Sequence, residues 1–191
     1  GAIIKAWKDN IIEPILVGDK EGIENICKSN NYDITGVRIV HEPDPEKSVE
    51  TAVRMVSSRQ ADILMKGKIG SSTLLKCVLN KEWGLRTGNL LSHFALFEVE
   101  TYPKVIAVTD VAMNIAPTLQ DKIAIVNNSV ACLNRLGYKM PKVAVLGAVE
   151  MVNENMQATL DAALLSKMNQ RDQIKNCIID GPLAFDNAVS L

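Results

Sequence analysis

The sequence predicts an α/β protein with mainly parallel sheets. Short apolar runs of strand length alternate with longer segments in which apolar residues recur at helical spacing. Apolar residues make up 47% of the 191-residue chain, which is enough to bury a sizeable core. Alternation of this kind is typical of parallel strands that are joined by right-handed helical crossovers.

Local signals place the expected elements along the chain. Asp44 followed by Pro45 is typical of a helix start, because aspartate caps the first turn and proline is tolerated there. Continuous apolar runs such as 143–146 predict strands that are covered on both faces. We expect strands at 12–17, 37–41, 62–66, 93–99, 104–109, 142–147 and 176–180. We expect helices at 20–29, 45–58, 71–80, 118–136, 155–169 and 183–190.

The regular alternation breaks at residues 84–110. The strands expected at 93–99 and 104–109 are separated by so few residues that they predict an antiparallel hairpin. We place a domain boundary just before this pair, which gives a first domain at 1–88 and a second at 89–191. The chain starts in one helix-like run and stops inside another, so we expect it to be truncated at both ends.

Composition argues against several functional classes. The net charge of −1 predicts no general attraction to nucleic acid or to anionic membranes. No apolar run reaches the ~18 residues that cross a bilayer. The four cysteines and two histidines are scattered, which is unlike a zinc site or a disulfide framework and favours a reducing cytoplasm.

Residues 62–76 predict an anion-binding turn. The apolar run Ile63–Met65 is followed by Lys66, Gly67 and Lys68, and then by three hydroxyl residues that open a helix. Backbone N–H groups at a helix start carry partial positive charge and bind anions. The spacing matches neither a Walker loop nor a dinucleotide fingerprint, so the identity of the anion stays open. An ordinary capped helix after a buried strand would show the same pattern.

Polar residues follow several of the expected strands. In open parallel sheets, ligands bind beyond the carboxyl ends of the strands, so these residues are candidates for a site. Each also has a structural interpretation as a turn, a helix cap or a solvated surface residue. The candidates after strands are Asp110, Asn114, Glu150, Asn153, Asp180 and Asp186, and the linker 84–93 adds Arg86, Thr87, Ser92 and His93.

Taken together, these segments resemble the phosphate acetyl/butyryl transferases. Their number and order make the match specific, and within that family the chain looks most similar to the butyryl branch. Residues 1–61 match more loosely, mainly through Pro14–Asp19. The segments that carry the resemblance are Met65–Gly67, Gly84–Gly88, Leu91–His93, Thr109–Asn114, Ala148–Asn153, Thr159–Ala163, Leu165–Met168 and Ile179–Leu183 with Asp186.

The resemblance implies a fold and an activity. The expected subunit has two α/β domains like those of the isocitrate and isopropylmalate dehydrogenases, an active site in the cleft between them, and a homodimeric or higher assembly. The expected reaction is reversible transfer of a butyryl or branched C4–C5 group, or less readily acetyl, between coenzyme A and inorganic phosphate through a direct ternary complex. Coenzyme A is then a substrate, and no metal or permanently bound cofactor is expected.

The resemblance also implies roles for individual residues. The expected catalytic residues are Ser92, His93, Asp180 and Asp186. Phosphate is assigned to Lys66, Gly67, Ser71, Ser72, Thr73, Lys76, Arg86 and Thr87, and coenzyme A to Asp110, Asn114, Glu150 and Asn153. Lys76 stands where the family usually has an arginine, which would grip phosphate with two hydrogen bonds. Family members also continue to a Ser-Arg pair and an aspartate that act on the sulfur.

Other functions remain open at this point. A phosphate acyltransferase that uses an acyl carrier protein would need a basic docking face for that acidic partner. A metal- and NAD-dependent decarboxylating dehydrogenase of the same fold would need converging carboxylates, for which Asp110, Asp180 and Asp186 are candidates. A non-catalytic module that only binds phosphate or coenzyme A is the third alternative.

Overall fold

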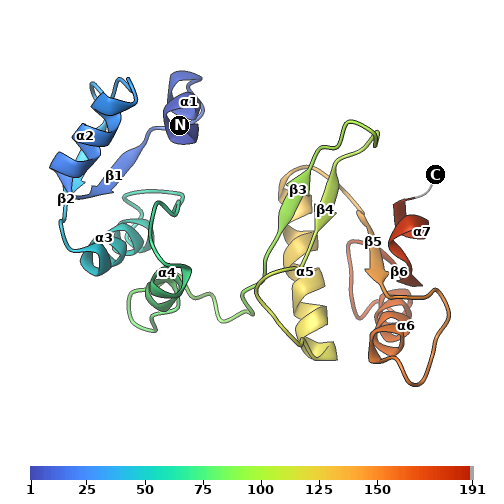
Figure 1. Ribbon diagram of the computed structural model, residues 1–191. Helices are drawn as coiled ribbons and strands as arrows, with labels where there is room; N and C mark the ends of the chain where they lie inside the picture. The colour runs from blue at the N-terminus through green and yellow to red at the C-terminus, as the bar shows by residue number, and fades with distance from the viewer. Residues whose placement is uncertain (190–191) are drawn as a thin grey trace. The chain divides into compact units, whose positions relative to one another are not determined.

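The computed structural model describes residues 1–189 (Figure 1). The chain forms two compact units, Gly1–Gly88 and Asn89–Leu191, which we call unit 1 and unit 2. Both units combine helices with short strands, so the predicted α/β class is confirmed. The helices expected at 20–29, 45–58, 71–80, 118–136 and 155–169 are all present, with small shifts at their ends.

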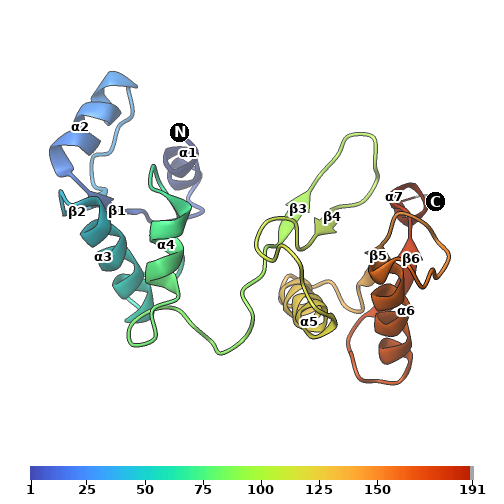
Figure 2. The same cartoon turned by 60° about the horizontal axis from the view of Figure 1, so that its bottom comes forward.

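Unit 1 contains a parallel pair of strands with helices packed around it. Ile15 lies opposite Arg38 in the pairing of β1 with β2. Helix α3 starts at the predicted cap, where the Asp44 carboxylate accepts hydrogen bonds from the N–H groups of Glu46 and Lys47. Helices α3 and α4 lie side by side (Figure 1, Figure 2). The elements are α1 (Ala2–Lys8), β1 (Ile15–Gly18), α2 (Lys20–Ser29), β2 (Arg38–His41), α3 (Pro45–Ser57) and α4 (Ser71–Val78).

The expectation of a strand at 62–66 was wrong. Ile63 is 78% exposed and Met65 is 61% exposed, and no strand is formed there. A buried strand needs hydrogen-bonded neighbours and cover on both faces. In the described part of unit 1 the sheet consists of β1 and β2 alone, so this apolar run has neither. The basic turn therefore follows an unpaired segment instead of the end of a strand.

Unit 2 contains an antiparallel hairpin and a parallel pair of strands. The hairpin of β3 and β4 confirms the pairing expected from the short connection. Helix α5 starts with a capping box, in which Thr118 and Asp121 bond each other's backbone N–H groups. The elements are β3 (Ala95–Phe97), β4 (Ile106–Val108), α5 (Leu119–Arg135), β5 (Lys142–Leu146), α6 (Gln157–Gln170), β6 (Ile178–Leu183) and α7 (Phe185–Val189).

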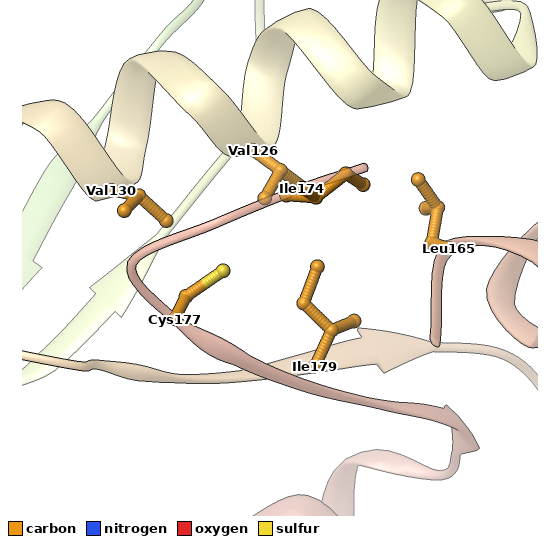
Figure 3. Close-up of a cluster of buried hydrophobic side chains, with 6 residues drawn as sticks. All are labelled: Val126, Val130, Leu165, Ile174, Cys177 and Ile179. Atoms are coloured by element: carbon orange, nitrogen blue, oxygen red, sulfur yellow. The ribbon is translucent and has the colours of Figure 1, made fainter. Parts of the chain in front are cut away.

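The core of unit 2 joins α5, α6 and β6. Figure 3 shows the side chains of these elements pointing toward one another. Leu165 and Ile174 are each only 1% exposed, so this is well-shielded apolar contact. The packing sets the position of α5 against the β5–β6 pair. The cluster consists of Val126, Val130, Leu165, Ile174, Cys177 and Ile179.

Two expectations about the β5–β6 sheet were wrong. We expected cover on both faces, but Leu146 is 48% and Ile178 is 51% exposed, because the helices pack on the face of Ile179. We also expected the last strand to end at 180. It continues through Gly181 and the buried Pro182, which is tolerated because a strand with one neighbour needs no second ladder of N–H donors. The helix expected at 183–190 is therefore shorter, and residue 190 lies outside the described residues.

A shielded ion pair links α5 to α6. The Lys122 ammonium lies 2.6 Å from the Asp161 carboxylate, which is only 4% exposed. Asp161 also accepts a hydrogen bond of 2.8 Å from the Gln157 side chain. Burial alone would raise the pKa of Asp161, but the hydrogen bonds from Lys122 and Gln157 outweigh it and the pKa is lowered. The carboxylate is thus held ionised at the helix contact.

We expect Lys122→Met to destabilise the protein by about 3 kcal/mol at neutral pH, because it leaves the Asp161 charge shielded and without its cation. Urea unfolding measures this change. The matched control is Lys139→Met at an exposed loop position between α5 and β5, which should change the free energy of unfolding by less than about 0.5 kcal/mol. Equal unfolding midpoints for the two variants would contradict a stabilising role for the ion pair.

Candidate functional site

The start of α4 offers backbone donors in unit 1. Gly70 precedes the helix and provides no side-chain cap. Among the described residues, no hydrogen-bond acceptor meets the backbone N–H groups of Ser71, Ser72 and Thr73. Helix starts leave such donors open, and together with the helix dipole they attract anions. Ser71 and Ser72 are also exposed, so their hydroxyl groups are accessible from solvent.

One basic side chain lies at this helix start and another at the far end of the helix. The Lys66 ammonium donates a hydrogen bond of 3.0 Å to the carbonyl oxygen of Ile69, which ties the basic turn to the residue before Gly70. Lys76 lies in the last turn of α4 and is exposed. Gly67 has open space where a side chain would begin, so sterics do not require glycine there. Unit 1 therefore brings Lys66 to the same turn as the open N–H groups.

The residues before Arg86 fold back onto the end of α4. The Asn80 side-chain oxygen accepts hydrogen bonds from the N–H groups of Glu82 and Trp83. The N–H of Leu85 donates to the carbonyl oxygen of Val78 at 2.7 Å. These bonds set the point from which the exposed Arg86 and Thr87 extend.

Gly84 and Trp83 hold the turn after α4 in its position. A Cβ atom at Gly84 would lie 2.5 Å from the carbonyl oxygens of Val78 and Asn80, so only glycine fits. The Arg54 guanidinium lies 4.4 Å from the centre of the Trp83 ring, a cation–π contact that ties the turn to α3.

In unit 2, the chain next to the hairpin brings His93 and Asp110 together. Ala95 lies opposite Val108 at the end of the paired strands, and beyond them the Thr109 hydroxyl donates a hydrogen bond to the carbonyl oxygen of His93. The Asp110 carboxylate accepts hydrogen bonds from the N–H groups of Ala112 and Met113, both at 3.0 Å, and from the Asn114 side chain. Burial acts to raise the pKa of Asp110, but these bonds and one from the His93 backbone lower it to about 2.

Side chains from three places hold the residues 90–93, which we call the Leu90–His93 segment. The Asn114 side chain donates to the carbonyl oxygen of Leu91 at 3.1 Å, and the Thr109 hydroxyl donates to that of His93. Asn128 of α5 donates to the carbonyl oxygen of Leu90 at 2.8 Å and to the Ser92 hydroxyl oxygen at 3.0 Å. The buried Nδ1 atom of His93 has no hydrogen-bond partner among the described residues.

The acidic candidates near β5 and β6 are more dispersed. Asp180 lies within β6, is exposed, and accepts a hydrogen bond from the N–H of Gly181. Asp186 is exposed in α7. Glu150 accepts a hydrogen bond of 2.6 Å from the side chain of Asn187, the residue after Asp186. The expectation that Asp180 follows the end of its strand was therefore wrong, because β6 continues past it.

Asn153 is used within its own loop. Its side chain accepts a hydrogen bond from the N–H of Asn155. Its backbone exchanges two hydrogen bonds with the hydroxyl of Thr159, which is fully buried. This arrangement closes the loop between β5 and α6.

Sequence reasoning missed Thr109 and Asn128. A signal for Asn128 existed. Its polar side chain lies among the apolar positions Ile125, Val126 and Val130 of the same helix, and a polar group in such a place needs a hydrogen-bond partner. Thr109 carried no comparable signal beyond its place before Asp110. Both residues matter because they bond segments that are distant in the sequence.

The described residues contain neither a metal-binding cluster nor a membrane-spanning helix. Among residues 1–189, no three His, Cys, Asp or Glu side chains gather in a way that could hold a metal ion. None of the described helices is both long and apolar enough to cross a membrane. A hollow of about 520 Å³ in unit 1 is lined by residues of α2, of β2 and of the loop between them, including Lys20, Cys27 and Tyr32, and contains none of the candidate residues.

We expect Asp110→Asn to change how stability depends on pH. The folded state lowers the pKa of Asp110 from 3.8 to about 2, so its stabilisation is present above about pH 4 and is lost as the pH falls toward 2. Between about pH 5 and pH 2 the wild type should lose about 1–2 kcal/mol more than the variant, after allowance for solvent screening. Urea unfolding across this range measures the difference.

The control is Glu154→Gln, which removes a carboxylate at an exposed position of unit 2. Its pH dependence should follow the wild type. If Asp110→Asn also follows the wild type, the ionised carboxylate does not stabilise the fold.

Comparisons with known proteins bear on the family of the chain. A family model described as phosphate acetyl/butaryl transferase matches residues 46–191. The phosphate butyryltransferase of Clostridium beijerinckii is 49% identical over 99% of this chain and 63% of its own length. The phosphate acetyltransferase of Thermotoga maritima is 42% identical over 99% of this chain and 64% of its own length.

A solved structure has the same fold. The crystal structure of a branched-chain phosphotransacylase from Enterococcus faecalis V583 is similar with a TM-score of 0.75 and 30% identity, covering 90% of this chain and 69% of that one. The chain thus spans slightly less than two thirds of the curated relatives above. The resemblance noted from the motifs is confirmed by a family model that covers most of the sequence. The chain belongs to the phosphate acetyl/butaryl transferase family.

Proposed function

We propose that the protein transfers a short-chain acyl group reversibly between coenzyme A and inorganic phosphate. A phosphate oxygen forms a bond to the thioester carbonyl carbon, the carbon–sulfur bond breaks, and the coenzyme A thiolate leaves and takes up a proton. The supporting observation is the 49% identity over 99% of the chain to a protein named phosphate butyryltransferase. We propose butyryl or a branched C4–C5 group as the acyl group, with acetyl as the runner-up.

Phosphate is assigned to the cationic residues of unit 1. The open N–H groups of α4 and the Lys66 ammonium can share the charge of one phosphate, and Arg86 can bind it with two parallel hydrogen bonds. Lys76 supplies a point charge. Supporting positions in the same assignment are Gly67, Ser71, Ser72, Thr73 and Thr87.

The reacting carbonyl is assigned to the Leu90–His93 segment. Ser92 and His93 can donate hydrogen bonds to an oxygen that gains negative charge as the phosphate attacks. Asp110 and Asn114 were expected to bind coenzyme A, but their polar atoms bond this segment and its neighbours. We assign them to holding the segment, and we keep Glu150 and Asn153 as candidate contacts for coenzyme A. Asp180 and Asp186 remain candidates for orienting the reacting groups.

The scheme needs no covalent intermediate. Correct positioning of two reactants can lower a barrier by ~7–11 kcal/mol, which is enough to support direct attack within a ternary complex. Coenzyme A enters as a substrate, and the scheme uses no metal and no bound cofactor. We further propose a homodimer or higher homo-oligomer, a cytoplasmic location, and the two-domain architecture of the isocitrate and isopropylmalate dehydrogenases.

The full-length protein should release thiol from acyl-CoA only when phosphate is present. Acetyl-, butyryl- and isobutyryl-CoA are compared, and kcat/KM should be highest for a four-carbon substrate. One methylene in an apolar pocket is worth roughly 1–3 kcal/mol, so differences of about tenfold or more are expected. A thiol reagent follows the reaction.

The same assay separates the alternatives. Activity with an acyl carrier protein but not with coenzyme A would replace the proposed substrate. Phosphate-independent reduction of NAD would replace the proposed reaction class. Ping-pong kinetics together with an acylated protein in the mass spectrum would overturn the direct route.

Arg86→Ala should raise the KM for phosphate by roughly tenfold or more, because a hydrogen bond to a charged group is worth about 1.5–3 kcal/mol. The acyl-CoA KM and the unfolding midpoint should remain close to those of the wild type. Lys81→Ala, which removes an exposed cation from the same turn region, is the control and should leave the phosphate KM within about twofold. An unchanged phosphate KM in Arg86→Ala would remove Arg86 from the site.

A further inference from the structure

The side-chain nitrogen of Asn128 donates two hydrogen bonds. It lies 2.8 Å from the carbonyl oxygen of Leu90 and 3.0 Å from the Ser92 hydroxyl oxygen. Asn128 belongs to α5, which the buried positions Ile125, Val126 and Val130 hold in the core of unit 2. The nitrogen therefore approaches the Leu90–His93 segment from a fixed helix.

The Leu90 carbonyl decides which way the amide of Asn128 is turned. A carbonyl oxygen can only accept a hydrogen bond, so the atom that faces it must be the nitrogen of the amide. That nitrogen carries two hydrogens and cannot accept. The Ser92 oxygen, which meets the same nitrogen, must therefore accept the second hydrogen.

This leaves the hydroxyl hydrogen of Ser92 available. Within residues 1–189, this hydrogen is donated to no acceptor. The Ser92 backbone is also constrained, because the carbonyl oxygens of Leu91 and His93 accept hydrogen bonds from Asn114 and Thr109. The hydroxyl oxygen is thus held in place. Its hydrogen is free to be donated to a bound molecule.

We propose that Asn128 is a positioning residue that makes the Ser92 hydroxyl a hydrogen-bond donor to a negatively charged or charge-gaining oxygen of the substrate. This inference rests on the proposed function and deepens it. The acceptor is either the thioester carbonyl oxygen, which gains charge during attack, or an oxygen of bound phosphate. Loss of a donor to the first oxygen lowers kcat, whereas loss of a donor to the second raises the KM for phosphate.

Asn128→Asp tests the assignment in a double-mutant cycle with Ser92→Ala. A carboxylate at this position has no hydrogen for Ser92 and attracts the hydroxyl hydrogen, so it reverses the direction of the bond. In the full-length protein, Asn128→Asp should reduce kcat or phosphate affinity roughly 10- to 100-fold, comparable to the loss of one preorganised donor. In the Ser92→Ala background the same substitution should cost severalfold less, because only the bond to the Leu90 carbonyl is then left to lose.

The matched control is Asn127→Asp, which makes the same change at the exposed neighbouring position of α5. It should leave kcat and the phosphate KM within about twofold of the wild type. Unfolding midpoints of all variants are measured beside the kinetics. An equal cost of Asn128→Asp in both backgrounds, or wild-type kinetics for Ser92→Ala, overturns the inference.

A second measurement keeps the inference separate from the proposed reaction. If the wild type releases no thiol from acyl-CoA with phosphate, the proposed function fails, whatever Asn128 does. Neutron diffraction of the wild type then shows the hydrogens directly. Two hydrogens on the Asn128 nitrogen and a Ser92 hydrogen that points away from it support the inference. A Ser92 hydrogen between the two atoms overturns it.

Discussion

The hydrogen bonds that hold the Leu90–His93 segment are the constraint on which the candidate site of unit 2 depends. The segment lies outside helix and sheet, so its carbonyl groups cannot be paired by a regular ladder. Side chains of Thr109, Asn114 and Asn128 pair them instead. Because an unpaired, partly buried carbonyl is costly, these bonds restrict the segment to one conformation. Ser92 and His93 acquire their positions from that restriction.

The ionised carboxylate of Asp110 connects this segment to the hairpin. Asp110 follows Thr109, whose hydroxyl bonds the His93 carbonyl oxygen, and its carboxylate accepts hydrogen bonds from Ala112, Met113 and Asn114 that close the loop after β4. A carboxylate with a pKa of about 2 stays charged at neutral pH and is a poor general base. Its value to the site is therefore structural, and in the proposed reaction the proton for the leaving sulfur must come from another group.

The two units use charge in different ways. In unit 1 the cations Lys66, Lys76 and Arg86 are exposed, so each contributes little to stability, and the proposed function has them act together on one phosphate. In unit 2 the pair of Lys122 and Asp161 is shielded and holds α5 against α6. Asn128 lies six residues after Lys122, about 9 Å along the same helix. The ion pair and the apolar cluster thus support the helix that positions Ser92.

The sequence by itself determined the features that depend on near neighbours. The Asp44–Pro45 start of α3, the hairpin across 93–109 and the main helices follow from caps, spacing and periodicity within a few residues. The motifs between Met65 and Asp186 were also enough to predict the family, which the comparisons confirm.

Only the tertiary structure decided how these pieces are paired and covered. Residues 62–66 have the composition of a buried strand, yet they find no neighbouring strand and stay exposed. Gly181 and Pro182 are typical of a turn, yet they lie at an irregularity inside β6, between Asp180 and Leu183, which both pair with β5. The bond from Asn128 to Leu90 spans 38 residues, and that from Thr109 to His93 spans 16. Local propensity acts over a few residues, so it cannot specify a partner at such separations, and the orientation of Ser92 depends on one.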